Sequence, residues 1–439
     1  MSTVGDLRAR ADDKLFTGDH AGALHLYAVL VRVQPENLDA RLRVADALLA
    51  LGEVQRAAVV YTALARHASH AGYPLRALVA LKVLSALEPQ LGTLLGGLAD
   101  LYAVGSTRLG RAVRISPGNA DQPLPEGLTV GDPPPVEQLA EVAKVVAADM
   151  SAISAYPESL PPVPLFSELP PSAFQSVLSA LKLVRTAPGQ VILGEGDVGL
   201  SFFVLARGTV RVSRNSDQGE VTLAVLGDGS IFGEMALVSA TPRTATVTAV
   251  TDCDLLEFDR EALGAAAQDV TTIARALDKF MRERLLNNLM ATAPLFSPLD
   301  RKQRFDLVRT FTAHDVSAGT RIIEEGQPGQ GLYVLLSGEV DISKIDRDEK
   351  VLLATLKPGD VFGEISLLHE QPTSASVTAA TNATVLFLAR DIFRRLIDAV
   401  DEIREYVENL GEERLMDTRI VMSHGGDFEE LTDDEIVLI

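Results

Sequence analysis

The sequence predicts a multidomain α + β protein, with N-terminal all-α helical repeats followed by two β-barrel, jelly-roll-like domains with flanking helices. Two internal repeats of different length lead to this fold class. A helical pattern recurs near the N-terminus, where Gly18 returns as Gly52 (52 − 18 = 34). A longer pattern of short strands recurs further along the chain, where Pro164 returns as Pro294 (294 − 164 = 130). Because each repeat is a unit of structure, these two periods divide the chain before any single motif is considered.

The shorter repeat covers roughly residues 5–105. The matched pairs are Gly18 and Gly52, Ala23 and Ala57, Tyr27 and Tyr61, and Leu30 and Leu64. The segments ALHLYAVLVRV and AAVVYTALA place apolar residues at helical spacing. This pattern resembles the tetratricopeptide repeat, and a helical bundle without that identity is the alternative. In either arrangement, stacked helix pairs leave a concave surface of the kind that binds a protein partner.

Composition sets the remaining boundaries. Residues 1–106 form the helical repeats, and residues 107–160 are rich in Pro and Gly before one helical stretch, as expected of a linker with one helix. Residues 161–288 and 289–410 are the two β-type domains, and residues 411–439 form an acidic tail.

The longer repeat is a duplicated domain. PLFS at residues 164–167 returns at residues 294–297. Further pairs at the same offset are Gly196 and Gly326, Gly199 and Gly329, Phe203 and Tyr333, Gly208 and Gly338, Phe232 and Phe362, and Glu234 and Glu364. Alternating stretches such as SFFVLARGTVRVS and GLYVLLSGEVDIS predict strands. Each copy is therefore expected to form a small antiparallel barrel flanked by helices.

The segment IFGEMALVSATPRTATV, residues 231–247, carries the chemistry. Its glycine lets the backbone approach a ligand, and a short helical turn from Glu234 would direct free N–H groups at an anion. Arg243 can pair with two phosphate oxygens at once. A carboxylate would repel a neighbouring phosphate, so Glu234 is better suited to accept a hydrogen bond from a sugar hydroxyl. These groups together indicate a cyclic-nucleotide site.

FGEMALVSATPRTATV resembles the phosphate-binding cassette of cyclic-nucleotide-binding domains, which occur in protein-kinase regulatory subunits, cyclic-nucleotide-gated channels and the bacterial catabolite activator protein. The resemblance implies that Glu234 holds the ribose 2′-hydroxyl and that Arg243 holds the cyclic phosphate. The ligand-binding residues expected in the first copy are Phe232, Gly233, Glu234, Met235, Ala236, Arg243, Thr244 and Ala245. Thr244 is compatible with cAMP and with cGMP, so the base stays open.

The second cassette, VFGEISLLHEQPTSASV at residues 361–377, has Thr373 where the first has arginine. A phosphate left without its cation costs ~2–5 kcal/mol. We therefore expect this pocket to be empty of ordinary cyclic nucleotide or to bind a less charged ligand such as a nucleoside. The residues of this possible second site are Gly363, Glu364, Ile365, Ser366, Thr373 and Ser374.

Composition narrows the function further. The formal net charge of −20 argues against DNA and against an anionic membrane surface. No apolar run reaches the ~18 residues that span a bilayer, and a single cysteine, Cys253, indicates a reducing, cytoplasmic setting and a buried structural thiol.

The sequence thus predicts a non-enzymatic intracellular receptor, without catalytic residues, cofactor or metal, that binds cAMP or cGMP in its first sensor domain. The helical repeats are expected to pass the change to a protein partner, with a helix at Val270–Met290 as the moving part. A scaffold or adaptor with vestigial cyclic-nucleotide domains is the alternative. A DNA-binding activator is disfavoured because the chain ends in the acidic GGDFEELTDDEIVLI.

Overall fold

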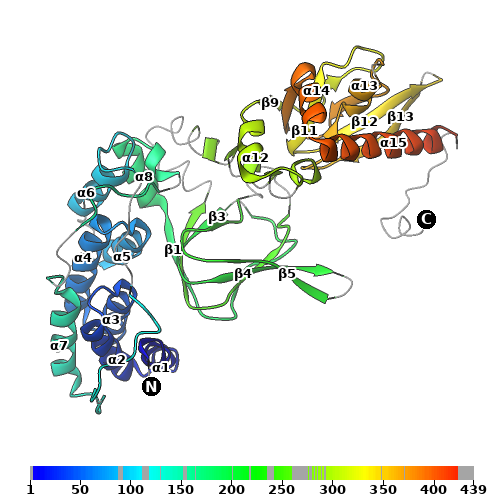
Figure 1. Ribbon diagram of the computed structural model, residues 1–439. Helices are drawn as coiled ribbons and strands as arrows, with labels where there is room; N and C mark the ends of the chain where they lie inside the picture. Colours follow the sequence, from blue (N-terminus) through cyan, green and yellow to red (C-terminus); the bar gives the residue numbers. More distant parts are fainter. Residues whose placement is uncertain are drawn as a thin grey trace. The chain divides into compact units, whose positions relative to one another are not determined.

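A computed structural model describes most of the chain. The described residues are 3–423 except 88–91, 111–117, 129, 152–155, 164, 200, 217–218, 235–241, 260–274, 276–278, 281, 284, 288, 291–292, 348 and 370. The chain divides into two compact units, Met1–Phe280 and Met281–Ile439 (Figure 1).

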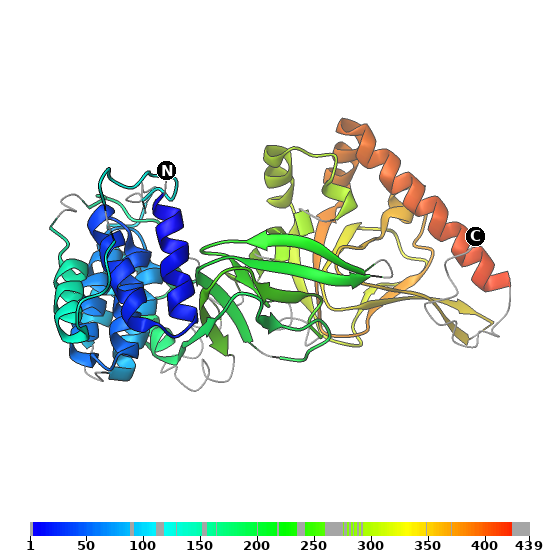
Figure 2. The same ribbon diagram turned by 90° about the horizontal axis from the view of Figure 1, so that it is seen from below.

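The first unit begins with a helical array, which we define as α1 to α6. These helices are α1 (Val4–Phe16), α2 (His20–Val33), α3 (Leu38–Ala50), α4 (Val54–His70), α5 (Pro74–Leu87) and α6 (Gly92–Tyr102). Successive helices pack against each other from α1 to α5 (Figure 2). Gly18 and Gly52 end α1 and α3 with φ of 82° and 80°, in the left-handed region that glycine adopts at least cost.

A side-chain pair recurs at the period of the shorter repeat. The Tyr27 hydroxyl donates to Asp12 at 2.5 Å, and one period later the Tyr61 hydroxyl donates to Asp46 at 2.5 Å. Each pair ties the second helix of one hairpin to the first. The helical region is therefore confirmed and has a regular internal repeat, while its identity as a tetratricopeptide array stays a prediction.

Helix α7 (Val136–Ala148) packs against α2, α3 and α4. The buried Arg41 guanidinium reaches its C-terminal end, donating from Nη1 to the Ala147 carbonyl at 2.7 Å. These terminal carbonyls have no partner within their own helix, so the arginine caps α7. Gln34 donates from Nε2 to the Asn119 carbonyl at 2.7 Å. Described parts of the segment expected to be a linker are thus fastened to the array.

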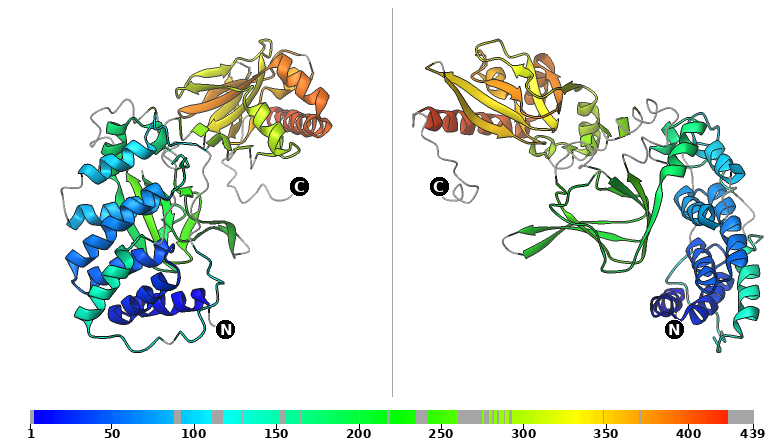
Figure 3. Two further views of the ribbon diagram at one scale, coloured as in Figure 1. Left: turned by 60° about the vertical axis from the view of Figure 1, so that its left-hand side comes forward. Right: turned by 180° about the vertical axis from the view of Figure 1, so that it is seen from behind.

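Two antiparallel sheets follow α8 (Pro171–Ala180) in the first unit (Figure 3). The strands are β1 (Lys182–Thr186), β2 (Val191–Leu193), β3 (Ser201–Arg207), β4 (Val210–Ser216), β5 (Gly219–Leu226), β6 (Ile231–Phe232), β7 (Thr246–Ala249) and β8 (Cys253–Asp259). The strand orders are β1-β8-β3-β6 and β2-β7-β4-β5. Apolar side chains from both sheets, including Phe203, Val247 and Leu255, form one core. Cys253 lies in this core, where burial raises the pKa of its thiol, as a structural role requires.

The second unit repeats this arrangement. Its strands are β9 (Thr312–Val316), β10 (Arg321–Ile323), β11 (Gly331–Ser337), β12 (Val340–Asp346), β13 (Glu349–Leu356), β14 (Val361–Phe362), β15 (Ser376–Ala379) and β16 (Ala383–Ala389). Every strand begins at the offset of the longer repeat from its counterpart, and the orders β9-β16-β11-β14 and β10-β15-β12-β13 are the same. Its helices are α12 (Arg301–Val308), α13 (Glu364–Leu368), α14 (Arg390–Ala399) and α15 (Asp401–Ser423).

The predicted fold class is confirmed at the level of N-terminal helices followed by two β-sheet domains with flanking helices. Among the described residues, strand pairing gives two separate four-stranded sheets in each domain and does not close them into a barrel, so the barrel and jelly-roll detail stays unconfirmed. The boundary placed at residue 410 falls inside α15. Most of the helix expected at Val270–Met290 lies outside the described residues. No helix in the described part of the chain is both long and apolar enough to cross a membrane.

Candidate functional site

The first cassette begins in β6, which pairs with β3. The Phe232 ring stacks on Phe203, with ring centroids 5.6 Å apart. Gly233 then takes a φ of 82°. A Cβ atom added there would lie 2.9 Å from Leu193 and 3.1 Å from Nη1 of Arg243, so a side chain at this position would crowd the guanidinium. The predicted contacts Met235 and Ala236 lie outside the described residues.

Arg243 reaches back into this turn and is only 7% exposed. Its Nη2 donates to the Ser201 carbonyl at 2.7 Å, and its Nη1 donates to the Gly233 carbonyl. Burial lowers the pKa of the guanidinium, an effect that the nearby carboxylates of Asp197 and Glu234 oppose. The arginine is therefore held as a desolvated cation beside Gly233 and Glu234, where an anion would complete its hydrogen bonding.

The backbone around Arg243 fixes this position. Its N–H donates to the Asp197 carbonyl at 2.8 Å, and its carbonyl accepts from the Gly196 N–H at 2.8 Å. Gly199 lies nearby, and an added Cβ there would lie 3.0 Å from Nη2 of Arg243, a tight contact. Thr244 is exposed and Ala245 is half-buried. The structure thus brings Gly233, Glu234 and Arg243 close together, and their roles toward phosphate and ribose stay predictions.

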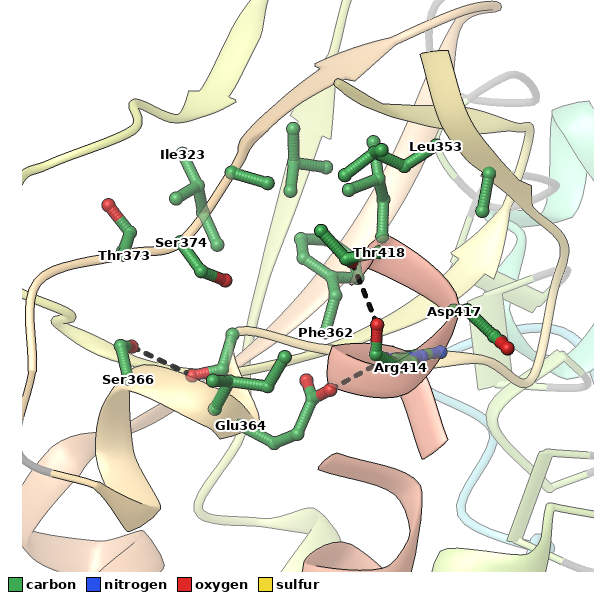
Figure 4. Close-up of a pocket in the computed structure, with 16 residues that line it drawn as sticks. Ile323, Leu353, Phe362, Glu364, Ser366, Thr373, Ser374, Arg414, Asp417 and Thr418 are labelled. Carbon is green, nitrogen blue, oxygen red and sulfur yellow. Dashed lines mark hydrogen bonds and ion pairs between the residues drawn. The ribbon is translucent and has the colours of Figure 1, made fainter. Parts of the chain in front are cut away.

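The second cassette lines a cleft in the second unit (Figure 4). The empty space in this cleft, counted with the solvent at its mouth, is about 710 Å³. All six residues predicted for a second site line it: Gly363, Glu364, Ile365, Ser366, Thr373 and Ser374. Gly363 takes a φ of 88° at the start of α13, and a Cβ there would lie 2.9 Å from the Gly331 carbonyl. The turn of the first cassette is therefore reproduced.

Thr373 keeps the backbone role of Arg243 without its charge. Its N–H donates to the Gln327 carbonyl at 2.9 Å, and its carbonyl accepts from Gly326 at 2.8 Å, as at the matching positions of the first domain. Its hydroxyl donates to the Glu324 carbonyl at 2.5 Å. The threonine side chain thus stabilises the neighbouring loop, and a cationic group at the phosphate position is lost.

A cation enters the second cleft from a different element. Arg414 of α15 pairs through Nη1 with Oε1 of the buried Glu364 at 2.9 Å (Figure 4). It also donates to the Val361 carbonyl at 2.5 Å. Asp417 and Thr418 line the same wall. The sequence analysis missed these three residues by placing them in an acidic tail. Ile403, Val407 and Gly411 recur at helical spacing across residue 410, and this was the signal that could have revealed them; all three positions are buried.

Among the described residues, no group of three or more His, Cys, Asp or Glu side chains is placed to hold a metal ion.

Comparison with known proteins agrees with this geometry. The family model of the cyclic nucleotide-binding domain matches residues 183–269 and again 313–400. A cAMP-dependent protein kinase regulatory subunit of Yarrowia lipolytica is 35% identical over 243 residues, which cover 55% of this chain and 61% of that protein. A second such subunit, from Eremothecium gossypii, is 33% identical, and the match covers 54% of this chain and 49% of the relative. The chain thus spans about half to three fifths of the length of these curated relatives.

Among solved structures, the chain is similar to the regulatory domain of Toxoplasma gondii PKA with cAMP, at 26% identity, 57% coverage of this chain, 92% coverage of that one and a TM-score of 0.28. The sequence matches and the duplicated cassettes lead to one conclusion: the chain carries two tandem cyclic-nucleotide-binding domains, similar to those of cAMP-dependent protein kinase regulatory subunits.

Proposed function

We propose that this protein is a non-enzymatic, cytoplasmic cyclic-nucleotide receptor that binds its ligand in the first sensor domain and regulates a protein partner. The observation that carries the proposal is the desolvated Arg243 guanidinium beside Gly233 and Glu234. Cyclic phosphate would take the remaining N–H donors of Arg243, and the ribose would donate to Glu234. Of the two cyclic nucleotides, cAMP is the better supported, because the curated relatives are cAMP-dependent kinase regulatory subunits.

The relatives also suggest the class of partner. Their names describe regulatory subunits of a protein kinase, so a kinase catalytic subunit is the partner that we propose for this chain. The route through the helical repeats is part of the same proposal, and the tetratricopeptide identity of those repeats belongs with it.

Calorimetric titration of the full chain with cAMP and cGMP tests the receptor proposal. We expect a single tight site for cAMP, located in the first domain. Absence of binding to both nucleotides would contradict the proposal and favour a scaffold with vestigial sensor domains.

The second cleft supports a second candidate function, as a site for an uncharged nucleoside-like ligand. Glu364, Ser366 and Ser374 offer polar groups to a ribose, whereas Thr373 offers no charge to a phosphate. The cation in the cleft, Arg414, is already paired with Glu364. Titration of a chain whose first site is inactivated, with adenosine, guanosine and cAMP in parallel, tests this candidate. Tighter binding of cAMP than of both nucleosides would contradict it.

A further inference from the structure

The helical array and the first β domain contact each other through a group of charged side chains. None of these side chains is among the predicted ligand-binding residues. Within the first unit, α5 packs against β1 and β3 and α6 packs against α8 (Figure 1). We name the charged group the docking cluster. It consists of Asp39, Arg43, Asp46 and Arg76 from the array and Arg185, Arg207, Asp228, Asp252 and Asp254 from the domain.

Five members of this docking cluster are buried, namely Arg43, Asp46, Arg207, Asp252 and Asp254, whereas Arg185 and Asp228 are exposed, and cations and carboxylates alternate along it. Arg185 joins Asp46 of α3 at 2.8 Å to Asp254 of β8 at 3.0 Å. Arg207 pairs with the same Asp254 at 2.7 Å. Arg43 of α3 joins Asp46 at 2.7 Å to Asp252. Because an unpaired buried charge is strongly unfavourable, such a set favours the one register of the two surfaces in which its ion pairs form.

The second domain shows whether the β fold depends on the five charged residues that the first domain contributes to the docking cluster. At the offset of the longer repeat, none of the five matching residues of the second domain carries the same charge as its counterpart in the first. Arg185, Arg207, Asp228, Asp252 and Asp254 correspond to Asp315, Ser337, Pro358, Asn382 and Thr384. The second domain nevertheless forms the same two sheets in the same strand order. A domain with these two sheets therefore forms without the five charges, and in the first domain three of them, Arg185, Asp228 and Asp252, pair with residues of the array.

One member of the docking cluster contacts the turn that precedes the first cassette in the sequence. Arg76 of α5 pairs through Nε with Asp39 at 2.7 Å and through Nη2 with Asp228 at 2.8 Å. Asp228 also accepts from the Gly208 N–H at 2.9 Å. It lies in the turn between β5 and β6, shortly before Gly233 in the sequence. Arg76 thus connects the array to the turn that leads into β6 and Gly233.

We infer that the helical array is a positioning element of the first nucleotide pocket, with Arg76 as the positioning residue. Arg76 fixes Asp228, and Asp228 in turn holds β6 and Gly233 in place. In this position Arg243 and the backbone of the first cassette can contact the same ligand. Pre-ordering of this kind strengthens binding, because less order must be imposed when the ligand arrives. Linkage makes the effect reciprocal, so a ligand in the first pocket stabilises docking of the array. The ligand part of this inference rests on the proposed receptor function.

The docked array has a consequence for partner binding. The sides of α3 and α5 that carry Asp39, Arg43, Asp46 and Arg76 are covered by the chain's own first domain. A protein partner can reach this surface only after the array is released, so the pocket, the docking cluster and partner access form one linked system.

The test compares Arg76→Ala with Arg56→Ala in the full chain. Arg56 is the matched control, because it pairs with Glu53 and Glu141 outside the docking cluster. We expect Arg76→Ala to speed amide exchange of residues 225–234 and to weaken cAMP binding about 5-fold or more, the lower end of typical coupling between sites. Arg56→Ala should leave both measurements as in the wild type, and Arg76→Lys should recover part of the loss.

Asp228→Asn tests the same contact from the domain side, since the amide keeps an oxygen for Gly208. Combined with Arg76→Ala it should add little to the single variant, as expected of two halves of one contact. Exchange and affinity of Arg76→Ala equal to those of Arg56→Ala would overturn the inference, and so would tighter binding. If the wild type bound no cyclic nucleotide, the receptor proposal would fail, and the exchange comparison would still decide the positioning role.

Discussion

Replacing Arg243 by Thr tests the first pocket with a residue that the chain itself uses at the matching position. The second domain shows that threonine is structurally acceptable there, because Thr373 keeps both backbone hydrogen bonds that Arg243 makes in the first domain. Its hydroxyl also finds a carbonyl in the adjoining loop. Arg243→Thr therefore removes the cation while preserving the local backbone, which Arg243→Ala does less cleanly.

The expected loss of affinity follows from the donors on Arg243. Among the residues that the structure describes, Nη1 and Nη2 each donate to one backbone carbonyl, so a second N–H on each and the N–H of Nε are the donors that a ligand would take. Two charge-assisted bonds to phosphate, at ~1.5–3 kcal/mol each, agree with the ~2–5 kcal/mol that removal of one partner of a desolvated charge pair costs. The dissociation constant for cAMP should rise by roughly 30-fold to several thousand-fold.

Isothermal titration of wild type and Arg243→Thr with cAMP measures this change, and a thermal melt of each checks that the fold is kept. A smaller stability loss of about 1–3 kcal/mol is expected from the two lost internal hydrogen bonds. Arg243→Lys is a useful intermediate, because it keeps the charge and loses the two-pronged geometry. Binding by Arg243→Thr within threefold of the wild type would refute the assignment of Arg243 to the phosphate.

Three further predictions concern the second unit and the array. Thr373→Arg should add a second cyclic-nucleotide site, so that titration stoichiometry rises from one to two per chain; an unchanged stoichiometry would show that the cleft is closed to phosphate for another reason. Arg414→Ala should lower the free energy of unfolding by about 2–4 kcal/mol in urea, somewhat less than for a fully buried pair, because Arg414 is 20% exposed. Glu364→Gln in the same chain should recover much of that loss, and no recovery would contradict the ion-pair explanation. Burial, assisted by the charge of Arg41, lowers the pKa of His67 to about 4. The unfolded chain therefore takes up this proton first, and stability should fall by up to about 3 kcal/mol as the pH drops from 6.5 towards 4, at ~1.4 kcal/mol per pKa unit. His67→Gln should flatten that slope, and an unchanged slope would place its origin elsewhere.

The duplication and the first site were predictable because their information is local. Alternating apolar residues and turn glycines are written within each strand pair, and all strands of the second domain begin at one common offset from those of the first. The cassette residues lie within one short stretch, residues 231–247. Residue types at short spacing were enough to predict that Glu234 and Arg243 lie together at one site, and to identify Thr373 as the departure in the second copy.

Tertiary structure alone decided which distant charges meet. Arg414 reaches Glu364 from a helix 50 residues further along the chain, and Arg76 reaches Asp228 across 152 residues. Comparison of the two repeats, position by position, could have marked Arg207, Asp252 and Asp254 as unusual, but not what they contact. A hydrophobic face leaves a period in the sequence because it must recur along one helix or strand. An ion pair between separate elements needs one residue on each, so it leaves no period, and only the packing of the elements brings the two charges together.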